Sequence, residues 1–326
     1  MGYEVDFLPV EAGGAAICVR WGTPGNYKVL VYDGGTAVSG EHLVRHVESL
    51  YMTSRVDYVV SSHPACDHSA GLAVVLRKLR VGELWMQRPW AYTAMPSTAM
   101  PAGRALEQLA DSKRIPVREP FAGARIGPFT VLSPRRDWYL DTLLPAFGQP
   151  ATAPRRRLLA LIASSHHWVH RWAGPHLRVD AATTAENESS VVLHAEFDGR
   201  GVVLTGRAGV RALDAAASYA EQQLGIDLPA SLCLIQAPNG GSPDHLSPTV
   251  LDRIVGRCKP RRARTYTKSA FISVSLEDGQ DPSPIVTEAL KRRGALSFVT
   301  PGTSLHHLHE MPDRGWYRAR PANMKT

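Results

Sequence analysis

The stretch that decides the fold is SSHPACDHSAGL, residues 61–72. A short apolar run, VDYVVSS, leads into it, and a run with helical character, SAGLAVVLRKLR, follows it. A continuous apolar run of this length is typical of a strand that is covered on both faces of a sheet. His63, Asp67 and His68 therefore lie in a loop between a strand and a helix. Their imidazole and carboxylate groups are common metal ligands, but Ala65 between them offers no lone pair.

The composition is that of a soluble globular protein, with 44% hydrophobic and 21% charged residues among 326. The N-terminal stretch MGYEVDFLPVEAGG carries three acidic residues, and no apolar run reaches the roughly 18 residues that a membrane span needs. We therefore expect neither a signal peptide nor a membrane span, and a cytoplasmic location. The four cysteines are far apart in the sequence, which favours reduced thiols over a disulfide framework.

The net charge of +7 leaves two interpretations open. A basic chain can bind nucleic acid, and the short clusters Arg155–Arg157 and KPRRAR (residues 259–264) could contact a phosphate backbone. The alternative is an Arg-rich surface that is simply solvated, because the other basic residues are scattered. Neither cluster has interleaved aromatic residues, so no stacking platform for single strands is visible.

Strands and helices alternate over most of the chain. The pattern predicts a helix from Glu41 to Leu50, with Ser39 or Gly40 as its cap, and a second helix from Val210 to Leu224. It predicts a β-hairpin around Asp198-Gly199 in SSVVLHAEFDGRGVVLTG. Between residues 136 and 182 the alternation of strands and helices stops. The pattern there predicts two helical pieces around a Pro/Gly linker, including a helix near 155–172. That stretch is either an inserted lid or partner-binding helix, or a helix packed on the sheet.

Eight landmarks occur in order along the chain: VLVYDGG, VDYVVSSHPACDHSAGL, IPVREPFAGARIGPFTVLSP, AENESSVVLHAEFDGRGVVLTG, LIQAPNGGS, AFISVS, PSPIVTEALKRRGALSFVT and HHLHEMPDRGW. Together they resemble the metallo-β-lactamase fold superfamily, and within it the branch of DNA-uptake competence proteins (ComEC type) and their stand-alone soluble relatives. The resemblance implies one four-layer αββα sandwich domain over residues 1–326. Its first half would be about 1–135, a helical insertion about 136–182, and its second half about 183–326.

Active members of this superfamily hydrolyse phosphodiesters, esters or amides with Zn²⁺ or Mn²⁺ at the edge where the two sheets meet. The resemblance implies ligands from three motifs: His-Pro-Asp-x-Asp-His, Leu-Thr-Gly-Asp and Pro-His-His-Gly-Ser. Here the first motif has Ala65 at its middle carboxylate, the second ends in Arg207, and the third reads Pro-Asn-Gly-Gly-Ser at 238–242. A guanidinium cannot ligate a cation and its positive charge repels one. The motifs around these positions are intact.

We therefore interpret the chain as a metallo-hydrolase relative that has lost its dinuclear metal site and acts as a pseudoenzyme, a binding or scaffold subunit with a protein partner and no cofactor. The alternative is an active phosphodiesterase-like or nuclease-like hydrolase with a rearranged mononuclear Zn²⁺ or Mn²⁺ site. Its residual ligands would be His63, Asp67 and His68, with Asp67 as the catalytic group and His245 as a possible substitute ligand. A third interpretation is a nucleic-acid-binding module without catalysis.

Arg207 gives the altered pocket two possible roles. It could form an internal ion pair with Asp67 in the space that a metal would fill. It could instead bind an anion such as phosphate, together with the Gly-rich loop that contains Asn239, Gly240 and Ser242. The stretch His306-His307-x-His309 belongs to the last landmark, and we interpret it as scaffold rather than as a metal site.

Overall fold

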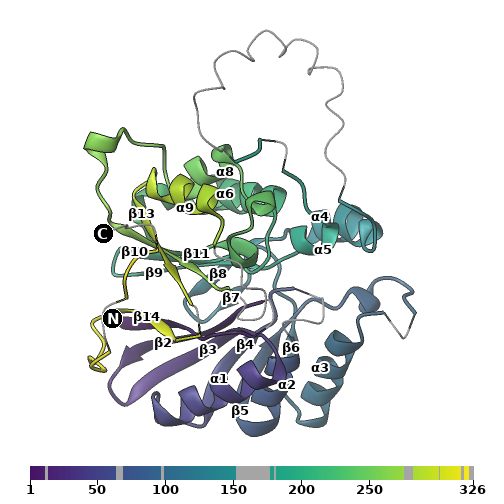
Figure 1. Cartoon of the computed structure of the whole chain (residues 1–326). Helices are drawn as coiled ribbons and strands as arrows, with labels where there is room; N and C mark the ends of the chain where they lie inside the picture. Colours follow the sequence, from purple (N-terminus) through teal and green to yellow (C-terminus); the bar gives the residue numbers. More distant parts are fainter. Residues whose placement is uncertain are drawn as a thin grey trace.

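A computed structural model describes most of the chain. The described residues are 1–11, 14–63, 69–96, 99–151, 177–179, 181–274, 282–300, 302–316 and 319–322. Within them, fourteen strands form two seven-stranded sheets that pack face to face (Figure 1). Helices cover the outer face of each sheet, so that the layers run helix, sheet, sheet, helix. The expected four-layer αββα sandwich is confirmed by this strand order and layering.

The first sheet has the order β14-β1-β2-β3-β4-β5-β6. Strands β14, β1, β2 and β3 pair antiparallel, whereas β3, β4, β5 and β6 pair parallel. The bounds are β1 (Gly2–Phe7), β2 (Ala16–Thr23), β3 (Asn26–Gly34), β4 (Arg55–Val60), β5 (Arg80–Trp85), β6 (Val117–Arg118) and β14 (Leu305–His309). Parallel neighbours need crossover helices, which are supplied by α1 (Ala37–Ser49), α2 (Ser69–Lys78) and α3 (Pro101–Ser112).

The second sheet repeats this plan in the order β13-β12-β11-β10-β9-β8-β7. Its antiparallel half is β7 to β10 and its parallel half β10 to β13. The bounds are β7 (Arg125–Ile126), β8 (Phe129–Ser133), β9 (Val192–Phe197), β10 (Arg200–Leu204), β11 (Leu232–Gln236), β12 (Lys268–Ile272) and β13 (Ala295–Val299). The predicted hairpin is confirmed, because β9 and β10 join through Asp198 and Gly199, both with positive φ.

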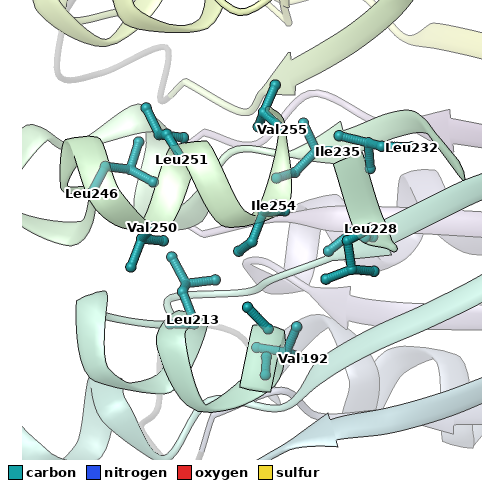
Figure 2. Packing of buried hydrophobic residues seen from close by; sticks show 14 of the residues in the cluster. Val192, Leu213, Leu228, Leu232, Ile235, Leu246, Val250, Leu251, Ile254 and Val255 are labelled. Carbon is teal, nitrogen blue, oxygen red and sulfur yellow. The ribbon is translucent and has the colours of Figure 1, made fainter. Parts of the chain in front are cut away.

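Three apolar layers hold the sandwich together. Between the sheets, Phe7 stacks on Phe271 and Tyr3 on Phe197, with ring centroids 4.3 and 4.5 Å apart. Outside the second sheet, Leu213, Val250 and Ile235 belong to a buried cluster that joins the sheet to its helices (Figure 2). The helices of this half are α4 (Arg136–Trp138), α5 (Ala185–Glu188), α6 (Val210–Leu224), α7 (Leu228–Ser231), α8 (Pro248–Ile254) and α9 (Pro284–Lys291). A third cluster lies between the first sheet and its helices.

The structure confirms the helix predicted from Val210 to Leu224 and corrects the one predicted from Glu41. Helix α1 begins four residues earlier, at Ala37, and its cap is Thr36, whose hydroxyl accepts from the N–H of Ser39. The prediction of Ser39 or Gly40 as cap was wrong because Gly40 is needed inside the helix. A Cβ there would lie 2.6 Å from Gly71 of α2, so the two helices meet at glycines.

Some predicted features lie outside the described residues. These are the helix near 155–172, the cluster Arg155–Arg157 and, in the first motif, Ala65, Asp67 and His68. The strands β1 and β14, which pair with each other over five residues, were not predicted. In the part of the chain that the structure describes, no helix has the length and apolar character needed to cross a membrane.

Candidate functional site

The candidate site lies at the edge where strands of both sheets end. Strand β4 leads into the loop that contains His63, β10 into the turn with Arg207, and β11 into the loop with Asn239. The carboxyl ends of parallel strands are the usual place for functional loops in α/β proteins. The main chain ties the two sheets together here, because the N–H of Val191 donates to the carbonyl of Ser62 across 2.8 Å.

The loop after β4 is positioned by a buried carboxylate. Asp33, at the end of β3, accepts from the N–H of Ser62 at 2.8 Å and from its hydroxyl at 2.6 Å. Ser62 in turn lies against Gly206 of the other sheet, where an added Cβ would be 2.5 Å from the Ser62 hydroxyl. Because His63 follows Ser62 and Arg207 follows Gly206, this contact brings two of the predicted site positions to neighbouring places on the edge. Sequence reasoning did not single out Asp33 or Ser62.

The turn after β10 is held by a glutamine that sequence reasoning missed. The side-chain oxygen of the buried Gln236 accepts from the N–H groups of both Thr205 and Gly206 at 2.9 Å. The Thr205 hydroxyl donates to the Gln236 carbonyl at 2.8 Å. These bonds satisfy the main chain at the point where the parallel pairing of β10 and β11 ends, and they place Arg207 at the edge. No motif spacing marks Gln236 in advance.

His245 joins the turn after β10 to the loop after β11. Its side chain is buried, and Nδ1 lies 3.0 Å from the carbonyl oxygen of Arg207 while Nε2 lies 3.0 Å from the Asn239 side-chain amide. A carbonyl oxygen only accepts, so Nδ1 carries the proton and Nε2 accepts from Asn239. Burial lowers the pKa of His245, and the nearby Arg207 charge acts in the same direction. The neutral ring is therefore the form that this pocket favours.

The loop at 238–242 has an unusual backbone. Asn239 and Gly240 both have positive φ, 45° and 62°, which asparagine and glycine tolerate better than other residues. The N–H of Asn239 donates to the carbonyl of Gly206, and the N–H of Ser242 donates to the carbonyl of Asn239. These two N–H groups of the loop therefore already donate to main-chain carbonyls and are not available to bind an anion.

The described residues of this edge do not fit a pair of metal ions. Asn239 and Gly240 supply no imidazole, Arg207 places a cation there, and both ring nitrogens of His245 already have partners. His63 is present and buried, and Asp67 and His68 lie outside the described residues. A catalytic zinc site needs three protein ligands as a rule.

One cluster elsewhere has the composition of a metal site. Among the described residues, the only three side chains of metal-ligating type with ligand atoms within 4.8 Å of one another are Asp198, His309 and Glu310. They lie beside the hairpin turn between β9 and β10, at the end of β10 opposite to Arg207. The Met1 amino group donates to Asp198. The predicted site residues that the structure describes, such as Arg207 and Asn239, lie at the other end of the strands.

Comparisons with known proteins give structural likeness only. No protein-family model matches the sequence, and no curated protein matches it. Solved structures that resemble it include the metallo-β-lactamase fold protein YhfI from Bacillus subtilis, with 10% identity, a TM-score of 0.48 and coverage of 94% of this chain and 100% of that one. A CmlA β-hydroxylase mutant has 12% identity and a TM-score of 0.44, covering 94% of this chain and 53% of that one.

A subclass B3 metallo-β-lactamase from a soil metagenome library, MEM-A1, has 13% identity and a TM-score of 0.34, covering 77% of this chain and 83% of that one. The similar structures named here are thus mainly metallo-β-lactamase fold proteins. The αββα architecture is established by the strand order and layers of this chain and not by these comparisons.

Proposed function

We propose that the chain is a metallo-β-lactamase-fold protein of the ComEC-like branch that has lost the dinuclear metal site and acts as a binding or scaffold subunit. The observation that carries this proposal is the bonding of His245 to both Arg207 and Asn239. The His245 ring, which would have to turn Nε2 towards a metal ion, bonds instead to the Asn239 side chain and to the main-chain carbonyl of Arg207. Internal hydrogen bonds of this kind keep the edge folded without an ion, because they satisfy its buried polar groups.

Arg207 makes the pocket unfavourable for a cation. A guanidinium remains charged at all ordinary pH values and cannot donate a lone pair. Divalent ions prefer sites in which carboxylates and imidazoles converge, whereas here a positive charge stands at the place of an expected carboxylate. The proposed partner is therefore a protein or an anionic ligand that contacts the edge without being hydrolysed.

Metal content tests this proposal directly. The untagged protein and its His63→Ala variant would be dialysed against trace Zn²⁺ and Mn²⁺ and assayed by elemental mass spectrometry. We expect less than about a tenth of an equivalent in both proteins, because too few ligands converge for tight binding. About one equivalent in the wild type, lost in His63→Ala, would overturn the proposal and support the mononuclear hydrolase.

Nucleic-acid binding is a second candidate function, favoured by a basic projection. The connection between α8 and β12, light green in Figure 1, extends from the helix layer of the second half. It exposes Arg257, Lys259, Arg261 and Arg262. The N–H of Lys259 donates to the carbonyl of Arg292 at 2.8 Å, which anchors this segment to the end of α9.

Salt dependence tests the second candidate. When a protein binds DNA through phosphate contacts, the logarithm of its binding constant falls linearly with the logarithm of the salt concentration. Each contact that is lost reduces the magnitude of this slope by about 0.9. Arg261→Ser/Arg262→Ser should therefore lower the slope by roughly 2. Glu221→Ser/Gln223→Ser, on exposed α6, is the matched control. A slope near zero in the wild type would exclude a nucleic-acid interface on this projection.

A further inference from the structure

A cluster of polar side chains around a cysteine lies at the end of β11 opposite to the candidate site. Cys233, at the start of β11, has its sulfur 3.6 Å from Nε2 of His307 on β14. The Tyr3 hydroxyl on β1 lies 3.2 Å from the same nitrogen, and the Arg200 guanidinium 3.9 Å from the sulfur. The four side chains come from both sheets, so that the cluster bridges the seam between them.

An irregularity in the sheet sets the position of the thiol. Gly201 of β10 pairs with Leu232 and Val202 pairs with Leu234, so Cys233 is skipped in the pairing. An extra residue of this kind bends a strand and redirects its side chain. Across the seam, Phe271 packs edge-on against the His307 ring at 6.3 Å between centroids, which gives the cluster an apolar wall.

The histidine stands beside the thiol as a neutral ring, with Nε2 3.6 Å from the sulfur. Burial lowers the pKa of His307 to about 4, with a further contribution from the Arg200 charge. The ring is thus neutral near pH 7, and in the tautomer protonated at Nδ1 the single lone pair of Nε2 is available to the thiol proton of Cys233. Burial raises the pKa of Tyr3, so that its hydroxyl keeps its proton. A thiol beside an imidazole base and a cation is the arrangement that activates cysteine nucleophiles.

We propose that Cys233 is a modification site for hydroperoxides, with His307 as its proton acceptor and Arg200 as the cation that stabilises the developing thiolate. The sulfur attacks one oxygen of the peroxide, an S–O bond forms and the O–O bond breaks. Sulfur loses two electrons to the peroxide. The thiol proton passes to His307 and then to the departing alkoxide or hydroxide, so that thiol and hydroperoxide become sulfenic acid and alcohol or water.

The reaction is open to small oxidants only. Cys233 is 9% exposed and Tyr3 is fully buried, whereas Arg200 is exposed at the mouth of the seam. The chain supplies internal references, since Cys258 is exposed and Cys18 is completely buried with its pKa raised well above the usual value by burial. Comparing the oxidation rates of these cysteines therefore shows whether Cys233 reacts because neighbouring groups activate its thiol or only in proportion to its exposure.

The experiment is peroxide oxidation of the folded, reduced full chain with a chelator present. Sulfenic acid is trapped with a cyclic dione and quantified at each cysteine by peptide mass spectrometry. We expect Cys233 to react at least about tenfold faster than the exposed Cys258, because a nearby base and cation raise thiolate reactivity. His307→Asn and Arg200→Gln should each lower the Cys233 rate, by about tenfold for His307→Asn.

Arg211→Gln is the matched control for Arg200→Gln, since Arg211 is also exposed but lies at the start of α6, beyond the other end of β10. It should leave the rate at Cys233 unchanged, and Cys258 should react equally in every variant. Because Arg200 is exposed, Arg200→Gln should not disturb the packing between the two sheets, so its effect on the Cys233 rate can be interpreted directly. A Cys233 that reacts more slowly than Cys258, or whose rate does not respond to His307→Asn and Arg200→Gln, would overturn the proposal.

Discussion

The side-chain amide of Asn239 lies 3.0 Å from Nε2 of His245 and donates a hydrogen bond to it. On the other side of the ring, Nδ1 donates to the carbonyl of Arg207. One buried imidazole thus connects the loops that follow β10 and β11. In this arrangement His245 holds the edge together, and binding a metal through Nε2 would require the loss of the bond to Asn239.

Removal of the Asn239 amide should destabilise the protein. Asn239→Ala leaves the buried Nε2 of His245 without its donor, and an unsatisfied buried polar atom costs about 1–3 kcal/mol. We expect the free energy of unfolding in urea to fall by that amount. The cost of Asn239→Ala should be smaller in a His245→Phe background, because the ring nitrogen that it leaves unsatisfied is then absent; His245→Phe alone is the reference, since it also removes the donor to the Arg207 carbonyl. Equal stability of Asn239→Ala and the wild type would show that the bond contributes nothing.

Reintroduced ligands should give the edge a metal ion. In Arg207→Asp/Asn239→His, a carboxylate and an imidazole replace a cation and an amide at neighbouring places beside Ser62 and His63. We expect the variant to retain close to one Zn²⁺ after dialysis, by elemental analysis, since carboxylate and imidazole are ligands that zinc accepts. Arg207→Gln/Asn239→Gln is the control and should retain none. If the reintroduced ligands bind no more Zn²⁺ than the control, the arrangement of the edge inferred here is wrong.

The contact between Gly206 and Ser62 should be intolerant of a side chain. Gly206 has φ of 57°, and its added Cβ would lie 2.5 Å from the Ser62 hydroxyl, which Asp33 holds in place. Gly206→Ala should therefore lower the free energy of unfolding by roughly 1–3 kcal/mol through backbone strain and the clash.

A companion change separates these two causes. Ser62→Gly removes the two closest atoms, so Gly206→Ala should cost less in the Ser62→Gly background than in the wild type. The remaining difference contains the backbone term, about 1 kcal/mol, and the contact with the Tyr32 hydroxyl, 2.9 Å from the added Cβ. Gly199→Ala, whose added Cβ would meet nothing within 4 Å, gives the strain of a positive φ without a clash. Thermal unfolding of the four proteins would show whether steric contact or backbone conformation dominates.

Two histidines whose pKa is lowered in the folded state, the buried His194 and the partly buried His307, should make the protein sensitive to acid. Burial lowers the pKa of His194 and of His307 to about 4, against 6.5 in an unfolded chain. Between these values the unfolded state binds more protons, so their contribution to stability is complete above about pH 6.5 and is lost as the pH falls towards 4. The loss at each site is on the order of 3 kcal/mol.

His194→Leu tests this pH dependence, because Nε2 of His194 is buried without a hydrogen-bond partner among the described residues. The free energy of unfolding, measured at half-unit steps between pH 7 and pH 4, should fall less steeply in the variant than in the wild type. Parallel curves for the two proteins would show that His194 protonates with an ordinary pKa in the folded state.

Single helices and turns could be predicted from the sequence because local patterns encode them, whereas the four-layer arrangement was implied by the family resemblance. The helix predicted from about Val210 to Leu224 is confirmed as α6, whose apolar positions recur at helical spacing and which ends before Gly225. The hairpin at Asp198-Gly199 was equally clear, because these residue types supply the positive φ of the turn. Helix α1 was misplaced because its glycine at position 40 looks like a boundary, whereas it serves contact with Gly71 of α2.

By itself the sequence determined the order of strands and loops and the chemical character of the edge: a cation at Arg207, and Asn239 and Gly240 in the following loop. Only the tertiary structure decided which atoms meet. Asp33 with Ser62, His245 with the Arg207 carbonyl, and Cys233 with His307 are 29, 38 and 74 residues apart. Such contacts depend on which strands become neighbours in a sheet and on how one sheet packs against the other, and periodicity along a single chain specifies neither.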